Sequence, residues 1–347
     1  MPRARATIGG GLFLALLLPY SQATAQEEKV TLEPQEKWSN VFAEAKVTFH
    51  FKVSVPEAFK GRVEWTFADA SKRVFPRGRG ETPIAAGAKP APVKISLQMP
   101  PVNAGVVLEA RLVVSVYADG QSKAATVFEK TMWIYPPDPF ANRKKWLEEL
   151  EITLYDPDSK SKTAEMLRGL KVPFEEIRNS AALGDVKKGL LLVGEGASFQ
   201  EEAGLAEALV QAAGRGLPVL CLAPSAGTFP IPQKEKGPTS PGSLFFQNQD
   251  IIRKLDKRLD AVGWAPDNQV VASSLILGAE DGKVVGTILE GDKGWSWLQL
   301  DYPSTKGRLI LCGFALTRQW DAGPAPRYLL ARLLEHVSEL TPKNLDK

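Results

Sequence analysis

Cysteine and histidine are scarce in this chain of 347 residues, and each of them occurs only twice. An exported protein held together by disulfides would carry more cysteines. The two cysteines, Cys221 and Cys312, lie in apolar runs that predict buried strands. We interpret them as two buried free thiols, with a single disulfide or one reactive thiol as the alternatives.

The sequence also lacks the spacings that hold metal ions and cofactors. It has no Cys-x-x-Cys, no His-x-x-x-His and no acidic triplet with EF-hand spacing, so we expect no metal site. Residues 194–196, Gly-Glu-Gly, are similar to a phosphate-binding turn, but the charge of Glu195 would repel an anion. We therefore expect no dinucleotide and no other cofactor.

Charge of one sign is not in excess. The chain has 43 Lys and Arg against 40 Asp and Glu, and without the two arginines of its first 25 residues the formal net charge falls from +3 to about +1. A nearly neutral protein has no basic surface for nucleic acid or anionic lipid. We therefore expect no nucleic-acid partner.

Long apolar runs are absent beyond the N-terminus. Residues 1–25 combine a basic start at Arg3 and Arg5, the run GLFLALLLPY and the small-residue sequence ATA. This combination is typical of a secretory signal peptide, and a short membrane anchor is the alternative. No later run is long enough for a transmembrane helix, so we expect an exported protein, periplasmic or extracellular, without a membrane span after cleavage.

The pattern of residues 29–136 is that of β-strands. KVTFHFKVSV, at residues 46–55, alternates apolar and polar side chains with the period of a half-buried strand. Clusters of proline and glycine, such as FPRGRGETPIAAGAKPAP at residues 75–92, separate the strand-like runs. Several short strands over this length predict an all-β, immunoglobulin-like sandwich.

A proline-rich linker at residues 137–146 leads to a second domain, residues 147–341, in which strand-like and helix-like runs alternate. This order predicts a two-domain protein whose second domain is α/β, with three layers and a mostly parallel sheet. The runs that carry the prediction are EITLYDP (151–157), SKTAEMLRGL (161–170), GLLLVGEGA (189–197), PVLCLAPSAG (218–227), GRLILCGFAL (307–316) and APRYLLARLLEHVSEL (325–340).

Taken together, these runs resemble the class I glutamine amidotransferase-like, flavodoxin-like domains that are often appended to secreted bacterial glycosidases and other exported proteins. The resemblance covers about residues 146–340. Members of that class carry a cysteine in a Gly-x-Cys-x-Gly elbow and a later His-x-Glu. Here the elbow is Ala223 to Gly227, Ser225 takes the place of the nucleophile, and the His-x-Glu is missing. The resemblance therefore implies a catalytically degenerate domain.

Ser225, Cys221 and His336 are the candidates for catalysis. Ser225 would lie on a strained strand-to-helix turn beside an oxyanion hole, although Pro224 lacks one of the N–H groups needed. The order Ser225, Asp321, His336 copies that of α/β-hydrolases, but His336 lies deep inside a predicted helix, on or beside its packed face. Burial would raise the thiol pKa of Cys221. We expect an ordinary turn after the strand and no catalysis.

In open parallel sheets, ligands bind beyond the carboxyl ends of the strands. Acids, a cation and an indole around one crevice there suit a sugar or a peptide terminus, while caps on the following helices are the structural alternative for Asp156 and Glu195. Trp295 and Trp297, two apart in a predicted strand, share a face and are expected to cover a core more than to stack on sugars. The predicted crevice residues are Asp156, Glu195, Ser225, Arg318, Trp320 and Asp321.

The sequence thus favours an exported, non-catalytic binding protein whose partner is a glycan, a cell-envelope component or another exported protein. This prediction depends on the resemblance and on the missing catalytic groups. A hydrolase that uses Ser225 or Cys221 and a structural envelope scaffold are the alternatives.

Overall fold

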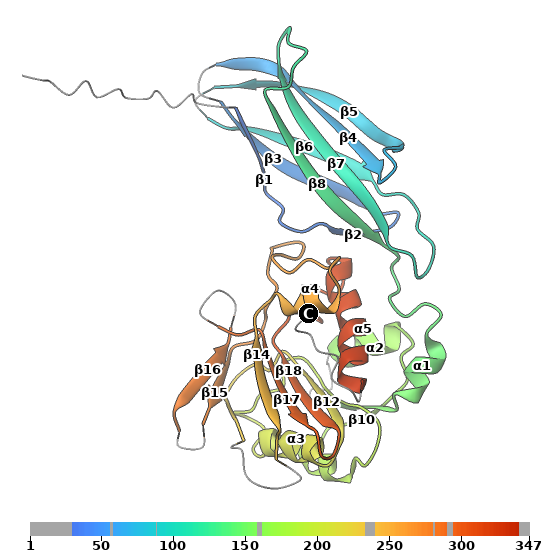
Figure 1. Cartoon of the computed structure of the whole chain (residues 1–347), viewed down its shortest axis with the longest axis vertical. Helices are drawn as coiled ribbons and strands as arrows, with labels where there is room; N and C mark the ends of the chain where they lie inside the picture. Colours follow the sequence, from blue (N-terminus) through green and yellow to red (C-terminus); the bar gives the residue numbers. More distant parts are fainter. Residues whose placement is uncertain are drawn as a thin grey trace, which may run out of the picture.

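A computed structural model describes most of the chain, which within the described residues is mostly β with several sheets and few helices (Figure 1). None of the described helices is long and apolar enough to cross a membrane. The predicted signal peptide lies outside the described residues. The described ranges are 30–55, 58–87, 89–157, 162–232, 240–279, 282–289 and 294–339.

The N-terminal region, residues 30–135, forms two sheets. The first has three antiparallel strands in the order β1 (Thr31–Pro34), β3 (Lys46–Ser54) and β6 (Ala91–Gln98). The second has five strands in the order β2 (Asn40–Phe42), β8 (Thr126–Tyr135), β7 (Leu108–Ala118), β4 (Phe59–Asp69) and β5 (Val74–Ala86). Strand β2 runs parallel to β8, and the other pairs are antiparallel.

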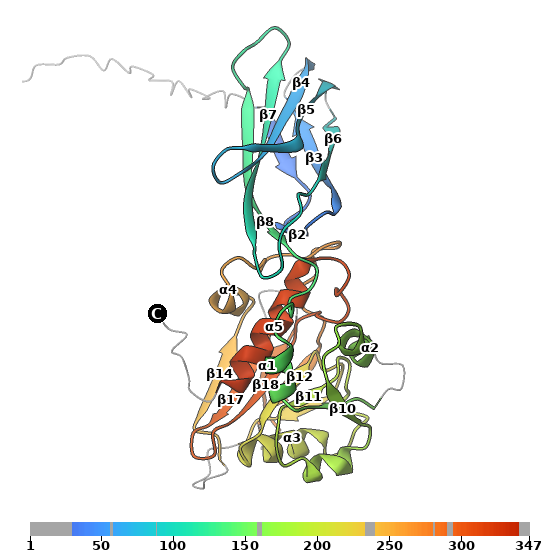
Figure 2. The ribbon, with the colours of Figure 1, turned by 90° about the vertical axis from the view of Figure 1, so that its right-hand side faces the viewer.

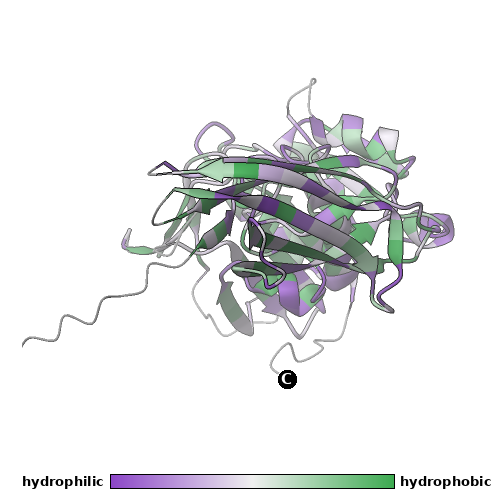
Figure 3. Cartoon of the chain, turned by 90° about the horizontal axis from the view of Figure 1, so that it is seen from above, coloured by the Kyte–Doolittle hydropathy of each residue, from purple (hydrophilic) through white to green (hydrophobic). Residues whose placement is uncertain are grey.

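One hydrophobic cluster lies between these two sheets, which makes the N-terminal region a β-sandwich. Phe49, Phe51 and Val53 of β3 are at most 2% exposed and meet Val63 and Val114 of the other sheet. The alternation that predicts β3 is therefore confirmed. Figure 3 shows the same alternation as changes between hydrophobic and hydrophilic colour along the strands.

The predicted loop at residues 75–92 is wrong, because most of it belongs to strand β5 at the edge of the five-stranded sheet. Pro76 and Pro83 are tolerated there, since an edge strand has one side that needs no N–H donor. Gly80 is required for space, because a Cβ at this position would collide with the indole of Trp65. Proline and glycine therefore mark an edge strand here rather than a break between strands.

The predicted linker is packed against the rest of the chain. Tyr135 and Phe140, at 0% and 4% exposure, belong to the main hydrophobic cluster of the C-terminal region, which we define as residues 144–339. Helix α1 (Lys144–Glu149) already begins inside the predicted linker. The connection is therefore anchored on both sides of its prolines.

A seven-stranded mixed sheet is the centre of the C-terminal region. Its order is β10 (Phe174–Ile177), β9 (Ile152–Tyr155), β11 (Leu191–Val193), β12 (Pro218–Leu222), β18 (Gly307–Cys312), β17 (Trp297–Tyr302) and β14 (Ser243–Gln247). The first five strands are parallel, whereas β17 and β14 are each antiparallel to their neighbours. The inner parallel strands are apolar because both of their faces are buried.

Helices cover both faces of this sheet (Figure 2). One face carries α1, α2 (Lys162–Gly169), α4 (Ile251–Leu255) and α5 (Pro324–Ser338). The other face carries α3 (Leu205–Gly214) and the 3-10 helix η1 (Ser180–Asp185). A small sheet also packs on the α3 face, with the order β13 (Thr228–Pro230), β15 (Leu275–Gly278) and β16 (Val284–Ile288).

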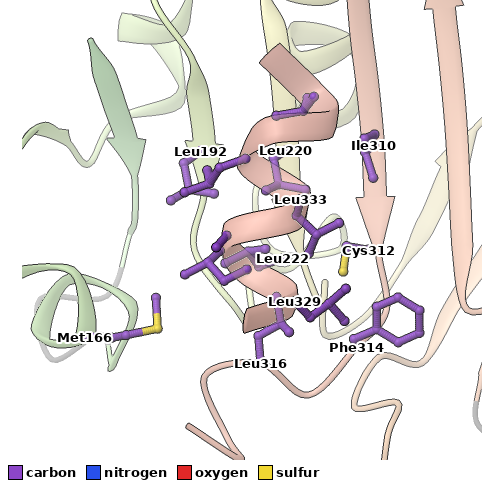
Figure 4. Packing of buried hydrophobic residues seen from close by; sticks show 14 of the residues in the cluster. Met166, Leu192, Leu220, Leu222, Ile310, Cys312, Phe314, Leu316, Leu329 and Leu333 are labelled. Carbon is purple, nitrogen blue, oxygen red and sulfur yellow. The ribbon is translucent and has the colours of Figure 1, made fainter. Parts of the chain in front are cut away.

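Helix α5 supplies much of the core on its face of the sheet. Leu329 and Leu333 are fully buried and lie over Leu220, Leu222 and Ile310 of the parallel strands (Figure 4). Burying a leucine side chain contributes about 1.5–3 kcal/mol, so this packing holds α5 firmly against β12 and β18.

Trp295 and Trp297 do not share a face, contrary to the prediction from their spacing. Trp297 lies in β17, is fully buried and faces His336 on the α5 side. Trp295 precedes the strand, is 37% exposed and packs on Phe246, which belongs to the cluster of the α3 side. The expected core role is therefore confirmed for Trp297 but not for Trp295.

Asn40 and Asp260 join the N-terminal region to the C-terminal region by reciprocal hydrogen bonds. The Asp260 carboxylate accepts the N–H groups of Ser39 at 2.6 Å and Asn40 at 2.7 Å, while the Asn40 side-chain oxygen accepts the N–H of Asp260 at 2.8 Å. Asn40 also donates from its side chain to the Arg258 carbonyl at 2.9 Å. Both side chains are buried. These bonds therefore fix the position of the N-terminal region relative to the C-terminal region.

The first turns of α5 add a second set of contacts between the regions. Arg327 donates to the Pro137 carbonyl at 3.1 Å and places its guanidinium 4.8 Å from the ring centre of Phe42. The Tyr328 hydroxyl donates to the Pro136 carbonyl at 3.0 Å. The helix that covers the sheet thus also holds the connection to the sandwich.

We expect Asp260→Ala to lower the free energy of unfolding by about 2–4 kcal/mol, because the buried N–H of Asn40 and the partly buried N–H of Ser39 lose their acceptor. Urea unfolding followed by circular dichroism measures this change. Asp185→Ala, at an exposed position, is the control and should cost little. Equal costs for the two variants would contradict the role given to Asp260.

Candidate functional site

The predicted site residues lie beyond the carboxyl ends of neighbouring parallel strands. Because β9, β11, β12 and β18 run in the same direction, their carboxyl ends meet at one edge of the sheet. The residues that follow these four strands in turn are Asp156, Glu195, Ser225 and the group Arg318, Trp320 and Asp321. The structure therefore brings the predicted set to one edge, although not into one crevice.

Asp156 and Glu195 fill the space between the ends of β9, β11 and β18. Asp156 is 3% exposed, and its carboxylate occupies the space that a Cβ on Gly194 would need. A carboxylate oxygen of Glu195 accepts the N–H of Thr317 at 2.7 Å, and the Glu195 N–H donates to the Thr163 hydroxyl at 3.0 Å. Burial raises the pKa of the Glu195 carboxyl. Glu195 thus holds the loop after β18 rather than capping a helix.

Ser225 is exposed, but the strained residue of the turn is Ala223. Ala223 has a φ of 27°, in the left-handed region that favours glycine, and it follows β12 directly. The N–H of Ser225 already donates to the Ala197 carbonyl at 3.0 Å. The chain then enters strand β13 and not the helix that follows a nucleophile elbow. A nucleophile elbow carries its reactive group at the strained position, and here that position holds a methyl group.

His336 lies far from both other members of the predicted triad. It is twelve residues into α5, about 18 Å along the helix axis at 1.5 Å per residue, whereas Asp321 precedes the helix and pairs with Arg327 at 2.9 Å. The His336 ring is 3.0 Å from the side-chain oxygen of Gln299 in β17, two strands away from the strand that leads to Ser225. The geometry excludes the triad.

A buried polar cluster gives His336 a structural role. Arg308 and Asp301 form an ion pair at 2.6 Å, and Gln299 donates to the same carboxylate at 2.9 Å. Arg308 also donates to the backbone carbonyl of His336, in the last turn of α5, where a positive charge is favoured. Burial and the nearby Arg308 lower the pKa of His336 to about 4.

The two cysteines point to opposite faces of the sheet. Cys221 belongs to the cluster on the α3 face and Cys312 to the cluster on the α5 face, although their strands are neighbours. Both are free and fully buried, so the interpretation as two buried thiols is confirmed. Burial raises the pKa of Cys312 to about 12 and that of Cys221 well above its usual range, which argues against Cys221 as a nucleophile.

A groove of about 840 Å³ lies beside the filled crevice, between α2 and the loop of residues 317–322. Arg318, Trp320 and Asp321 of the predicted set line it, together with Lys162 and Glu165 of α2, which sequence reasoning missed. No sequence signal could have found these two, because the groove depends on how α2 packs beside the loop. Asp156, Glu195 and Ser225 do not line this groove.

The charges of the groove are only partly satisfied within the protein. Arg327 is engaged by Asp321 and by the Trp320 carbonyl at 2.9 Å, and its guanidinium lies 5.2 Å from the Trp320 ring centre. Arg318 is exposed and reaches the side-chain oxygen of Gln269 only at 3.5 Å. Lys162 is also exposed. A half-buried indole and two exposed cations therefore line the same groove.

Among the residues that the structure describes, no group of three or more His, Cys, Asp or Glu side chains is placed to hold a metal ion.

No known protein family matches the chain, and no curated protein matches it either. Solved structures resemble parts of it. A glycosyl hydrolase family 2 member from Bacteroides cellulosilyticus aligns with 72% of this chain and 37% of its own, at 13% identity and a TM-score of 0.24. A β-glucuronidase from glycoside hydrolase family 2 aligns with 62% of this chain and 22% of its own, at 9% identity and a TM-score of 0.23.

The periplasmic chaperone SfaE aligns with 31% of this chain and 57% of its own, at 8% identity and a TM-score of 0.23. The chain thus spans less than two thirds of the length of each of these three proteins. Likeness at this level identifies neither a fold nor a function.

The lowered pKa of His336 predicts a pH-dependent stability. Between its folded pKa of about 4 and its ordinary value of 6.5, the unfolded chain binds a proton that the folded chain does not, so stability falls as the pH falls. The contribution of His336 is up to about 3 kcal/mol at neutral pH. We expect His336→Gln to reduce the pH dependence of urea unfolding across this range, and an unchanged dependence would contradict the assignment.

The burial of both thiols predicts that they react only after unfolding. With a chromogenic disulfide reagent at neutral pH, the native protein should release no thiol colour, whereas the urea-unfolded protein should release two equivalents per chain. Rapid labelling of native Cys221, mapped by mass spectrometry, would restore it as a candidate nucleophile.

Proposed function

We propose that this chain is an exported, non-catalytic binding protein whose ligand occupies the groove between α2 and the loop of residues 317–322. One observation carries the proposal. The crevice at the strand ends is filled by the chain's own carboxylates, Asp156 and Glu195, while the groove beside it presents Arg318 and Trp320 to solvent. Recognition is thereby displaced from the strand ends to the groove.

The proposed fold classes follow from strand order. The N-terminal region is an immunoglobulin-like domain, residues 29–136, and its three-plus-five arrangement of strands supports this assignment. The C-terminal domain, residues 147–341, is flavodoxin-like and similar to glutamine amidotransferases. In chain order its five parallel strands lie as second, first, third, fourth and fifth, which is the flavodoxin-like order.

The proposed location is outside the cytoplasm, in the periplasm or beyond the cell. It depends on residues 1–25, whose basic start, apolar run and small-residue site are typical of a cleaved signal peptide. A ligand of the cell envelope fits that location.

The absence of catalysis is proposed from the positions of the candidate groups. Ala223 places a methyl group at the strained position of the turn, and the N–H of Ser225 is already bonded within the protein. The ring of His336, in the last turn of α5, is hydrogen-bonded to Gln299 of β17. A serine without an adjacent base is a poor nucleophile, so Ser225 lacks the surroundings that catalysis would need.

The chemistry of the groove favours an acidic glycan of the cell envelope as the ligand. A guanidinium such as that of Arg318 pairs with a carboxylate through charge-assisted hydrogen bonds, and the indole of Trp320 offers an apolar surface to a sugar ring. The exposed Lys162 adds a second positive charge at the other wall. A peptide with a free carboxyl terminus presents part of the same chemistry and is a separate outcome of the test.

We expect Arg318→Ala to weaken the binding of carboxylate-bearing oligosaccharides at least about tenfold, which corresponds to about 1.4 kcal/mol. Isothermal titration calorimetry with such oligosaccharides, and with neutral ones of the same length, measures the effect. Arg253→Ala removes an exposed arginine outside the groove and is the matched control. Ser225→Ala should keep full affinity, because Ser225 does not line the groove.

Three results would overturn this proposal. The first is an affinity that Arg318→Ala and Arg253→Ala leave equally unchanged. The second is binding of the neutral oligosaccharides as tightly as the charged ones. The third is binding of peptides with a free carboxyl terminus in place of the oligosaccharides, which would assign the groove to a protein partner.

A further inference from the structure

Strand β14 (Ser243–Gln247) ends the seven-stranded sheet with an unpaired edge. Among the described residues it pairs only with β17. The outer side of such a strand presents backbone N–H and C=O groups that can pair with another strand. Proteins usually protect these edges with charged side chains, proline or a bulge.

Among the described residues, strand β14 itself carries no charge, proline or bulge, whereas strand β10 at the opposite edge of the same sheet does carry charge. Strand β10 has Glu175 and Glu176, and Glu176 forms ion pairs with Arg168 at 2.5 Å and Arg178 at 2.8 Å. The sequence of β14, SLFFQ, contains neither charge nor proline. The two edges of one sheet therefore differ in whether they resist pairing.

Apolar side chains are exposed on both faces of β14. Phe245 lies opposite Gln299 on the α5 face and is 42% exposed, while Leu244 lies opposite Leu300 on the α3 face and is 40% exposed. Trp295, 37% exposed, packs on Phe246 with ring centres 5.5 Å apart and extends the apolar surface on the α3 side. Exposed apolar surface of this kind marks interaction sites.

The sequence of β14 complements itself in one antiparallel register. If two copies of the strand pair with their centres at Phe245, then Phe245 lies opposite Phe245, Leu244 opposite Phe246, and Ser243 opposite Gln247. Each pair joins like with like: aromatic with aromatic, apolar with apolar and polar with polar. Cross-strand pairs of this kind stabilise a sheet by about 0.2–1 kcal/mol each.

We propose that β14 pairs with β14 of a second copy of this chain, antiparallel and centred on Phe245, so that two seven-stranded sheets form one continuous sheet across a two-fold axis. A two-fold axis requires one surface to complement itself, which this strand does. The backbone edge supplies the hydrogen bonds, and the exposed Leu244 and Phe245 supply the apolar contact. The Arg318 groove lies at the ends of other strands, so this interface is independent of the proposed function.

Cysteine cross-linking tests the register directly. Opposed residues of an antiparallel pair have Cβ atoms about 4.5–5.5 Å apart, close to the spacing that a disulfide spans. Under mild oxidation, Phe245→Cys should form a disulfide-linked dimer on a non-reducing gel. The native Cys221 and Cys312 are buried and do not interfere. Val127→Cys, at an exposed strand position of the sandwich, should stay monomeric, and a monomeric Phe245→Cys would overturn the register.

Light scattering of the native protein tests the association itself. We expect the mass of two chains for the wild type and for Val127→Lys, and half that mass for Phe245→Lys. Circular dichroism should show that Phe245→Lys remains folded, and if it unfolds, the cysteine experiment decides. A wild type that stays monomeric at every concentration, or a dimer that survives in folded Phe245→Lys, would overturn the proposal.

Discussion

The burial of α5 against the parallel strands is the constraint on which the other features of the structure depend. Leu329 and Leu333 hold the helix on β12 and β18, and Arg308 holds its last turn through the His336 carbonyl. Its first turns carry Arg327 and Tyr328, which bind the connection to the sandwich. Because α5 begins directly after the loop of residues 317–322, its packing also fixes where that loop ends. The shape of the groove therefore depends on the packing of α5.

One hydrogen bond, between Glu195 and Thr317, connects the strand ends to the loop that lines the groove. Glu195 spans from the end of β11 to Thr317 after β18, at the cost of a buried carboxyl whose pKa is raised. That bond lies at the strand ends, where an open α/β sheet ordinarily receives a ligand. The same bond positions the loop that presents Arg318 and Trp320. In the proposed function, the occupied strand ends and the groove for the ligand are thus two consequences of one interaction.

The sequence predicts the parts of this fold that depend on local periodicity. Alternation in β3, continuous apolar runs in β12 and β18, and the helical spacing of α5 all lead to the observed elements. Strand β5 is missed because its prolines and glycines are tolerated only at a sheet edge, a position set by distant strands. Strand β13 is not predicted for a similar reason, since it forms by pairing with β15, nearly fifty residues later. The α2 wall of the groove likewise depends on tertiary packing.

Equilibrium dialysis against a carboxylate-bearing oligosaccharide, with the recovered ligand weighed by mass spectrometry, tests the central claim most directly. The claim is that this protein binds such a ligand in the groove between α2 and the loop of residues 317–322 and does not transform it. It predicts saturable retention of an oligosaccharide of unchanged mass, and loss of that retention in Arg318→Ala. Recovery of a cleaved oligosaccharide, or no retention by the wild type, would contradict it.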